Sequence, residues 1–235
     1  EPFVGRMLNK YDRSSYYLAT KLPCWLVNTK EDARRIFTEQ LKRLDKDYVD
    51  FFLLHSLSRD SWNKMLSLGV LDVCEELKAE GRIRYFGFSF HDEYSAFEEI
   101  AAYRKWDFCQ IQLNYKDVDE QAGIKGYELA AKLGIPLVIM EPVKGSNLAN
   151  YPDEIAGVFR KVNPDKSTAS WALRWVGTLP NVKVILSGMS DMAQVKDNIR
   201  TFSPFVPLNG EEQAAVAEVT GMLNKRVNNG CTGCR

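Results

Sequence analysis

The chain has 235 residues, of which 45% are apolar and 26% charged, an ordinary composition for a globular protein long enough for one α/β barrel domain. Its 31 Lys and Arg residues balance its 31 Asp and Glu residues, so no net charge favours nucleic acid or an anionic membrane as a partner. No stretch approaches the roughly 20 apolar residues that span a bilayer, and five cysteines do not make a disulfide framework in a chain this long. We therefore expect a cytoplasmic protein.

Short apolar runs rich in Val, Ile, Tyr and Phe predict strands, and segments with helical periodicity lie between them. In chain order we expect strand 16–20, helix 29–44, strand 48–54, helix 61–80, strand 83–89, helix 93–105, strand 107–114, helix 120–133, strand 135–140, helix 166–177, strand 182–187, helix 190–201 and helix 211–225. Residues 142–165 predict a long connection. Alternation of strand and helix indicates a parallel sheet. Nearly continuous apolar strands indicate burial on both faces, as in a barrel or a doubly wound sheet.

Polar residues follow the predicted strands, at the points where the strands end. In a parallel α/β barrel the active site lies at the C-terminal ends of the strands. The strand-end residues are Lys21, His55, Ser89, Gln110, Gln112, Asn114, Glu141, Ser187 and Gly188. Their convergence predicts an active site at one mouth of the fold.

Lys21 and His55 are the strand-end residues with the most specific chemistry. A lysine ammonium lowers the pKa of a neighbouring phenol or carboxyl, and an imidazole can position or relay a proton to a carbonyl oxygen. The residues alone leave two other interpretations open, a solvated lysine and a hydrogen-bonded wall histidine.

Two further residues lie near these strand ends. His91 either borders a substrate pocket or forms a surface pair with Asp92. Trp25, just after Lys21, either forms a wall of a substrate pocket or belongs to the apolar core.

Six segments resemble successive strand-end motifs of the aldo-keto reductase superfamily: "YYLATK", "DYVDFFLLHS", "GRIRYFGFSFHD", "CQIQLNY", "IMEPVKGSNL" and "ILSGMSDMAQVKDN". The resemblance runs in order from Glu1 to about Asn198, and "EPFVGRML" resembles the helix after the family's second strand. It implies a (β/α)8 TIM barrel over residues 1–227, with the first two strands upstream of Glu1. It also implies reduction of a small-molecule aldehyde or ketone by hydride transfer from a nicotinamide cofactor.

The family's catalytic residues are carried over one at a time. Lys21 matches the catalytic lysine and His55 the catalytic histidine, whereas the tyrosine that acts as general acid and the aspartate that pairs with the lysine would lie upstream of Glu1. Ser89 and Gln110 match residues that hold the nicotinamide carboxamide, with Gln112 as the alternative on the same strand. Met140 stands at the ring-stacking position.

The resemblance also implies two phosphate-binding segments. The loop along the pyrophosphate corresponds to Glu141, Pro142, Val143, Lys144 and Gly145. The adenosine phosphate and adenine site corresponds to Ser187, Gly188, Met189, Ser190, Gln194 and Asn198, where backbone N–H groups at a helix start suit an anion.

Several positions depart from the family pattern. Phe90 replaces an asparagine beside the carboxamide site, and Met140 replaces a tyrosine. Gly188 and Gln194 replace basic residues that grip the 2′-phosphate, which weakens the preference for NADP(H) and leaves NAD(H) as the alternative. Phe90 and Met140 favour a rival interpretation, a nucleotide-binding regulatory or electron-transfer subunit without turnover. A metal-dependent barrel hydrolase is disfavoured, because His55 and His91 are the only histidines.

The sequence "CTGCR" contains Cys231 and Cys234 and allows three interpretations. The two thiols are incidental, or they belong to a metal or redox site that needs further ligands, or they begin a bacterial ferredoxin pattern. A branch of aldo-keto reductase-like proteins is similar in having an iron–sulfur module after the barrel. We therefore expect residues 228–235 to start a segment that binds a [4Fe-4S] cluster in the intact protein, with an electron-transfer partner.

Overall fold

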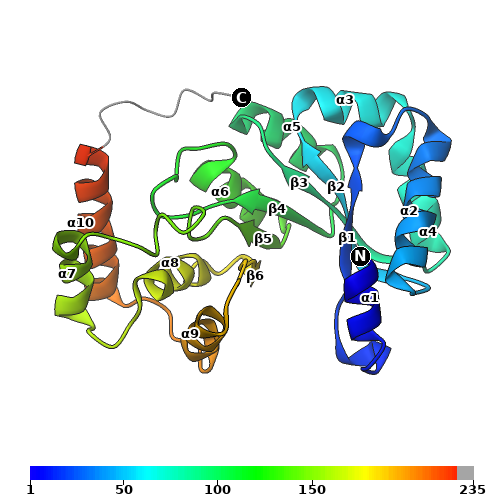
Figure 1. The fold of residues 1–235 in the computed structure, drawn as a ribbon. Coiled ribbons are helices and arrows are strands. Elements are labelled where there is room, and N and C mark those ends of the chain that lie inside the picture. Colours follow the sequence, from blue (N-terminus) through cyan, green and yellow to red (C-terminus); the bar gives the residue numbers. More distant parts are fainter. Residues whose placement is uncertain (227–235) are drawn as a thin grey trace. The chain divides into compact units, whose positions relative to one another are not determined.

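The computed structural model describes residues 1–226 and has two compact units (Figure 1). Unit 1 comprises residues 1–111 and 124–137, and unit 2 comprises residues 112–123 and the described residues from 138 onward. The strands follow one another in chain order in the sheet, β1-β2-β3-β4-β5-β6. Helices alternate with the strands along the chain. The predicted sheet with alternating helices, the pattern of a (β/α) barrel, is therefore confirmed.

Unit 1 contains the first four strands and the helices that accompany them. Its elements are α1 (Pro2–Leu8), β1 (Ala19–Pro23), α2 (Lys30–Leu44), β2 (Val49–Leu57), α3 (Arg59–Ser67), α4 (Val70–Ala79), β3 (Ile83–Phe90), α5 (Tyr94–Tyr103), β4 (Phe108–Gln112) and α6 (Gly123–Leu133), with short 3-10 helices at Arg13–Ser15 and Cys24–Leu26. Helix α2 begins at a capping box, in which Thr29 and Asp32 each bond the other's backbone N–H. Helices α2 and α4 lie side by side (Figure 1).

The register of β1 to β4 decides which side chains share a face of the sheet. These strands pair in parallel, with Lys21 opposite Leu53 and Leu53 opposite Gly87. Gly87 in turn lies opposite Phe108, and a Cβ atom on Gly87 would stand 2.4 Å from the Phe108 carbonyl oxygen. A residue with no side chain is therefore needed at this step of β3.

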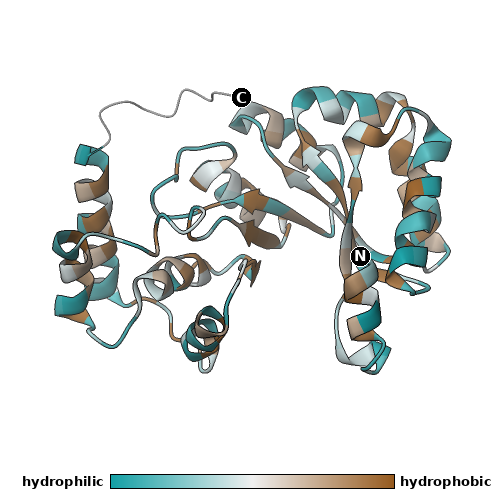
Figure 2. Ribbon diagram, in the orientation of Figure 1, coloured by the Kyte–Doolittle hydropathy of each residue, from teal (hydrophilic) through white to brown (hydrophobic). Residues whose placement is uncertain are grey.

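Unit 2 contains the remaining elements around an aromatic core. They are β5 (Leu137–Met140), α7 (Asp153–Val162), α8 (Thr168–Gly177), β6 (Val182–Ile185), α9 (Met192–Phe202) and α10 (Gly210–Arg226). Phe159 of α7 stacks on Trp171 of α8, with ring centroids 4.4 Å apart. Helix α10 lies beside α7 and carries hydrophobic and hydrophilic residues (Figures 1 and 2). Its Val216 and Val219 are buried in the same core.

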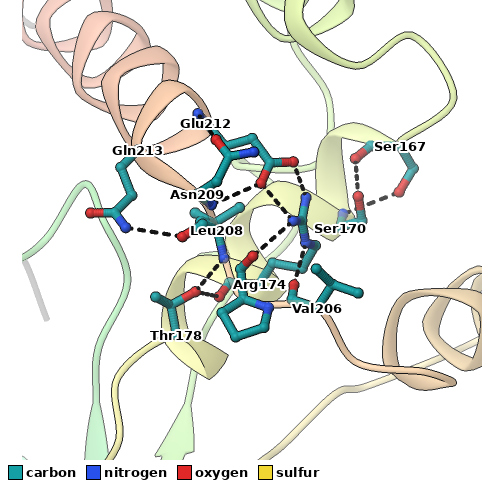
Figure 3. A network of polar contacts seen from close by, with 10 residues as sticks. Ser167, Ser170, Arg174, Thr178, Val206, Leu208, Asn209, Glu212 and Gln213 are labelled. Atoms are coloured by element: carbon teal, nitrogen blue, oxygen red, sulfur yellow. Dashed lines mark hydrogen bonds and ion pairs between the residues drawn. The ribbon is translucent and has the colours of Figure 1, made fainter.

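A buried ion pair joins α8 to the start of α10 (Figure 3). The guanidinium of Arg174 donates to both carboxylate oxygens of Glu212 at 2.6 and 2.7 Å, and the two side chains are only 4% and 6% exposed. Arg174 also donates to the carbonyl oxygens of Val206 and Pro207. The side chain therefore fixes the segment between α9 and α10, and the Arg174 partner holds the pKa of Glu212 below its usual range.

Several boundaries differ from the sequence predictions, and β2 extends through His55 to Leu57 instead of ending at Leu54. The first strand covers Ala19–Pro23 and not 16–20, because its ladder begins where Asp50 and Phe51 donate to the Leu18 carbonyl oxygen, so Lys21 lies within β1. The predicted helix 61–80 is two helices, α3 and α4, separated by Gly69, whose φ of 67° is left-handed. The predicted connection 142–165 contains helix α7.

Candidate active site

Lys21 and His55 lie on one face of the sheet in unit 1. Lys21 is opposite Leu53, and His55 stands two positions further along β2, so the alternation of side chains places both on the same face. Both side chains are half-buried, and Gln40 donates to the Lys21 carbonyl oxygen at 2.7 Å. Burial lowers the pKa of Lys21. Burial also lowers the pKa of His55, and the positive charges of Lys21 and His91 add to this effect.

Ser89 and Gln110 share the same face. They lie opposite each other in β3 and β4, each two positions beyond the row that contains Gly87 and Phe108. Ser89 is fully buried, and its hydroxyl oxygen accepts a hydrogen bond from the Ser56 N–H at 2.8 Å. Ser56 has a φ of 58°, and this bond stabilises the irregular end of β2. The Ser89 hydroxyl is the acceptor in this bond, so its own proton remains available to donate.

Three residues near this face are Phe90, Trp25 and Asp92. Phe90 is fully buried and packs on Phe97 of α5, with ring centroids 5.3 Å apart, so it is a core residue. Trp25 is 58% exposed, which excludes the core interpretation for its side chain. Asp92 accepts hydrogen bonds from the backbone N–H groups of Arg59 and Glu93 and so closes the turn after β3.

A cleft of about 630 Å³ lies within unit 2, a size typical of small-molecule sites. Nine residues predicted for cofactor binding line it: Glu141, Pro142, Val143, Gly145, Ser187, Gly188, Ser190, Gln194 and Asn198. The predictions missed further lining residues: Ser146, Ala149, Asn150, Ala169, Leu173, Leu186 and Asp197. These come mainly from the turn after Gly145 and from α8, whose helical pattern carried no signal of a site. Met140, Lys144 and Met189, which were predicted for the same segments, are not part of the lining, and neither are Ser89 and Gln110 of unit 1.

Hydrogen bonds order the polar wall of this cleft near α9. The Gln194 side-chain oxygen accepts from the Ser190 N–H at 2.8 Å, and Asn198 donates to the Ser187 hydroxyl at 2.8 Å. Asp191 caps α9 by accepting a hydrogen bond from the Gln194 N–H. This N–H group at the start of the helix therefore already has an acceptor within the protein. Among the described residues, the lining includes the carboxylates of Glu141 and Asp197 and no Lys or Arg.

Among residues 1–226, neither a metal-binding cluster nor a membrane-spanning helix occurs. Residues 1–226 contain no cluster of His, Cys, Asp or Glu that could hold a metal ion, and Cys231 and Cys234 lie outside this range. Cys24, Cys74 and Cys109 are buried free thiols, and burial raises the pKa of Cys24 to about 11, which disfavours a nucleophilic role. Within the same range, no helix combines the length and apolar character needed to cross a membrane.

The strand–helix alternation and the polar residues on one face of the strands define the chain as a protein of the (β/α)-barrel class. The family model described as Aldo/keto reductase family matches residues 1–220. The chain belongs to this family. It is an oxidoreductase that reduces a carbonyl compound by hydride transfer from a nicotinamide cofactor.

Solved structures are similar to this chain over most of its length. An aldo-keto reductase from Bacillus halodurans in its holo form has 25% identity, with 93% of this chain and 76% of that chain covered and a TM-score of 0.76. An aldo-keto reductase from Klebsiella pneumoniae in complex with NADPH has 22% identity, coverage of 93% and 74% and a TM-score of 0.74. An aldo/keto reductase from Brucella melitensis has 24% identity, coverage of 93% and 79% and a TM-score of 0.71. Among curated proteins, no sequence matches this chain.

Proposed function

We propose that Lys21 and His55 are the catalytic pair of this chain and act on the oxygen of an aldehyde or ketone. The observation that carries the proposal is their position on one face of the sheet, with a half-buried ammonium and a half-buried imidazole whose pKa is lowered. Lys21 stabilises the anionic form of the phenol that the resemblance places upstream of Glu1. His55, as neutral imidazole, donates a hydrogen bond that orients the substrate carbonyl.

The cofactor is proposed to be NADP(H), and a similar structure is a complex with NADPH. When bound, the nicotinamide ring supplies the hydride, while the protein supplies binding and orientation. Ser89 and Gln110 have the donors and acceptors that fit a carboxamide. The cleft in unit 2 has the size, the backbone turns and the hydroxyl and amide groups that fit the phosphate and adenosine portions. NAD(H) stays the alternative, because the lining holds no cation for a 2′-phosphate.

The test is turnover of NADPH with a panel of aldehydes and ketones, together with direct measurement of NADPH affinity. We expect Lys21→Met and His55→Gln each to lower kcat by about 10²–10⁴-fold with NADPH affinity retained. A protein that binds NADPH but reduces no carbonyl, before and after these changes, is the nucleotide-binding subunit that the sequence left as a rival. A protein that binds neither NADPH nor NADH contradicts the proposal.

An iron–sulfur segment starting at residue 228 and an electron-transfer partner remain part of the proposal, on the spacing of Cys231 and Cys234 alone. Iron content and visible absorption of the anaerobically purified intact protein test this segment. A cytoplasmic location is also proposed, since the three buried cysteines are free thiols.

A further inference from the structure

Lys144 differs from its neighbours in the loop after β5. Glu141, Pro142, Val143 and Gly145 line the cleft, whereas Lys144 does not. Its ammonium instead forms an ion pair with Asp117, which follows β4 in the same unit. The residue that the sequence placed beside a phosphate therefore has a carboxylate partner within the protein.

The Asp117 carboxylate is a buried hydrogen-bond acceptor that is surrounded by donors. Its side chain is 6% exposed, while that of Lys144 is 39% exposed. Asn114 donates to the same carboxylate at 3.2 Å, and Gln112 lies at 3.4 Å with its own side-chain oxygen held by Gln121. A carboxylate buried to this degree needs a cation and hydrogen-bond donors, and here it has both.

The same group of residues holds the backbone of the loop. Asn114 donates to the Glu141 carbonyl oxygen at 3.2 Å, while its own side-chain oxygen accepts from the N–H groups of Lys116 and Asp117. Asn114 therefore ties the two loops together where they leave their strands.

The backbone of this loop is in a costly conformation. Glu141, Lys144 and Ser146 have left-handed φ values of 56°, 47° and 75°, at which non-glycine residues are strained. Backbone hydrogen bonds close short turns here, from Lys144 N–H to the Glu141 oxygen and from Asn147 N–H to the Lys144 oxygen. A strained turn persists when surrounding contacts over-determine it, and the ion pair is such a contact.

We propose that Asp117 is a positioning residue for the cofactor loop, and that Lys144 acts through its pair with Asp117 and is not a ligand of the pyrophosphate. The pair holds the backbone of residues 141–146 in the conformation in which the residues on either side of Lys144 line the cleft. This inference rests on the proposed function of the cleft, but the ion pair's effect on the loop is measurable without any cofactor.

The two roles of Lys144 predict opposite effects of removing Asp117. If Lys144 is a phosphate ligand, Asp117→Asn releases its ammonium, and NADPH affinity stays the same or rises. If the pair positions the loop, Asp117→Asn and Lys144→Met weaken NADPH binding alike, by about tenfold or more, and the double variant shows no further loss. The matched control is Asp153→Asn, which removes an exposed carboxylate paired with Arg160 on α7.

The experiment measures dissociation constants for NADPH and for 2′-AMP, which has no pyrophosphate, and amide hydrogen exchange of residues 141–148 without cofactor. We expect weaker NADPH binding, unchanged 2′-AMP binding and about tenfold faster exchange of this segment in both single variants and in the double variant. General loss of the fold would weaken 2′-AMP binding as well, and thermal unfolding of the double variant checks for it.

Each outcome decides one of the two claims. Exchange that is unchanged in both single variants overturns the positioning role, whatever the cofactor affinities. Loss of NADPH affinity in Lys144→Met together with wild-type or higher affinity in Asp117→Asn also overturns it. Failure of the unaltered protein to bind any nicotinamide nucleotide overturns the proposed function of the cleft, while the exchange result still decides the role of the ion pair.

Discussion

The indole of Trp25 lies against the imidazole of His55, with ring centroids 5.1 Å apart and ring planes inclined by 50°. Trp25 follows β1, and His55 lies in β2. The indole is itself 58% exposed, so it covers one side of the imidazole without closing the face to solvent. The lowered pKa of His55 means that the imidazole is neutral at physiological pH and retains one N–H to donate.

Trp25→Ala is expected to raise the pKa of His55 toward its ordinary value of 6.5, because loss of the indole returns water to the imidazole. NMR titration of the two histidines measures this, with His91→Asn to assign the signals. The His91→Asn variant is itself expected to raise the pKa of His55, since it removes a neighbouring positive charge. A Trp25→Ala variant in which the His55 pKa is unchanged or lower would show that the indole does not desolvate the ring.

The lowered pKa of His55 also has a consequence for stability. The folded state holds the imidazole neutral in a pH range where the unfolded chain has bound a proton. The free energy of unfolding therefore decreases as the pH falls through 6.5 toward the folded pKa, and this contribution is smaller in Trp25→Ala.

The strand–helix alternation could be predicted because it depends on local hydrophobic periodicity, and the boundaries failed where a single residue outweighs that pattern. Tyr16 and Tyr17 resemble strand residues, yet the ladder begins only at Leu18. Gly69 interrupts a continuous helical pattern by adopting a left-handed φ. Helix α7 has acidic residues in its first turn and basic residues in its last, a usable signal that the surrounding Pro, Gly and Asn obscured.

For the candidate site, the sequence could assign residues to particular strands and loops, although Lys21 and His55 lie within β1 and β2 and not after them, and it could not predict the direction of each side chain. Lys144 is the example, because its partner Asp117 lies 27 residues earlier and meets it only when β4 and β5 are folded. Phe90 is another, since its burial against Phe97 follows from strand parity once the register of β3 is known. Such orientations depend on which segments pair in the folded chain. The hydrophobic periodicity of the sequence does not show which segments pair.

Removal of one partner of the buried pair in unit 2 is expected to destabilise the protein strongly. Arg174→Met leaves the Glu212 carboxylate buried without its cation and should lower the free energy of unfolding by about 3–5 kcal/mol in urea denaturation. Arg160→Met, in the exposed pair with Asp153, should cost about 1 kcal/mol or less and is the control. Equal effects of the two changes would contradict the structural role assigned to Arg174.

The same pair predicts a dependence on acid. The folded pKa of Glu212 is lowered, so its contribution is present above the ordinary value of 4.5 and is lost as the pH falls through the folded pKa. In Arg174→Met the Glu212 pKa rises, so the loss of stability in acid that comes from this group becomes smaller than in the unaltered protein or reverses, and urea denaturation as a function of pH measures the difference.

Two glycines are expected to differ sharply in their tolerance of a methyl group. Gly87→Ala places a Cβ atom against the Phe108 carbonyl oxygen and ring and should destabilise the protein by about 1–3 kcal/mol. Gly188→Ala adds its Cβ to open space and should change stability by less than about 0.5 kcal/mol. Thermal or urea unfolding of the two variants makes the comparison. A stable Gly87→Ala protein would show that the β3–β4 register differs from that described here.

Gln194→Arg is expected to raise the affinity for NADPH by about tenfold, because a guanidinium on the cleft wall gains a charge-assisted bond to the 2′-phosphate. The neutral Gln194 side chain now accepts from the Ser190 N–H, and the described lining contains carboxylates but no cation. NADH lacks the 2′-phosphate, so its affinity should not change, and the ratio of the two dissociation constants separates a new contact from a general effect on the cleft. The control Gln213→Arg adds the same charge at α10, outside the cleft lining, and should alter neither constant. If Gln194→Arg leaves both affinities unchanged, the adenosine 2′-position does not lie at this wall.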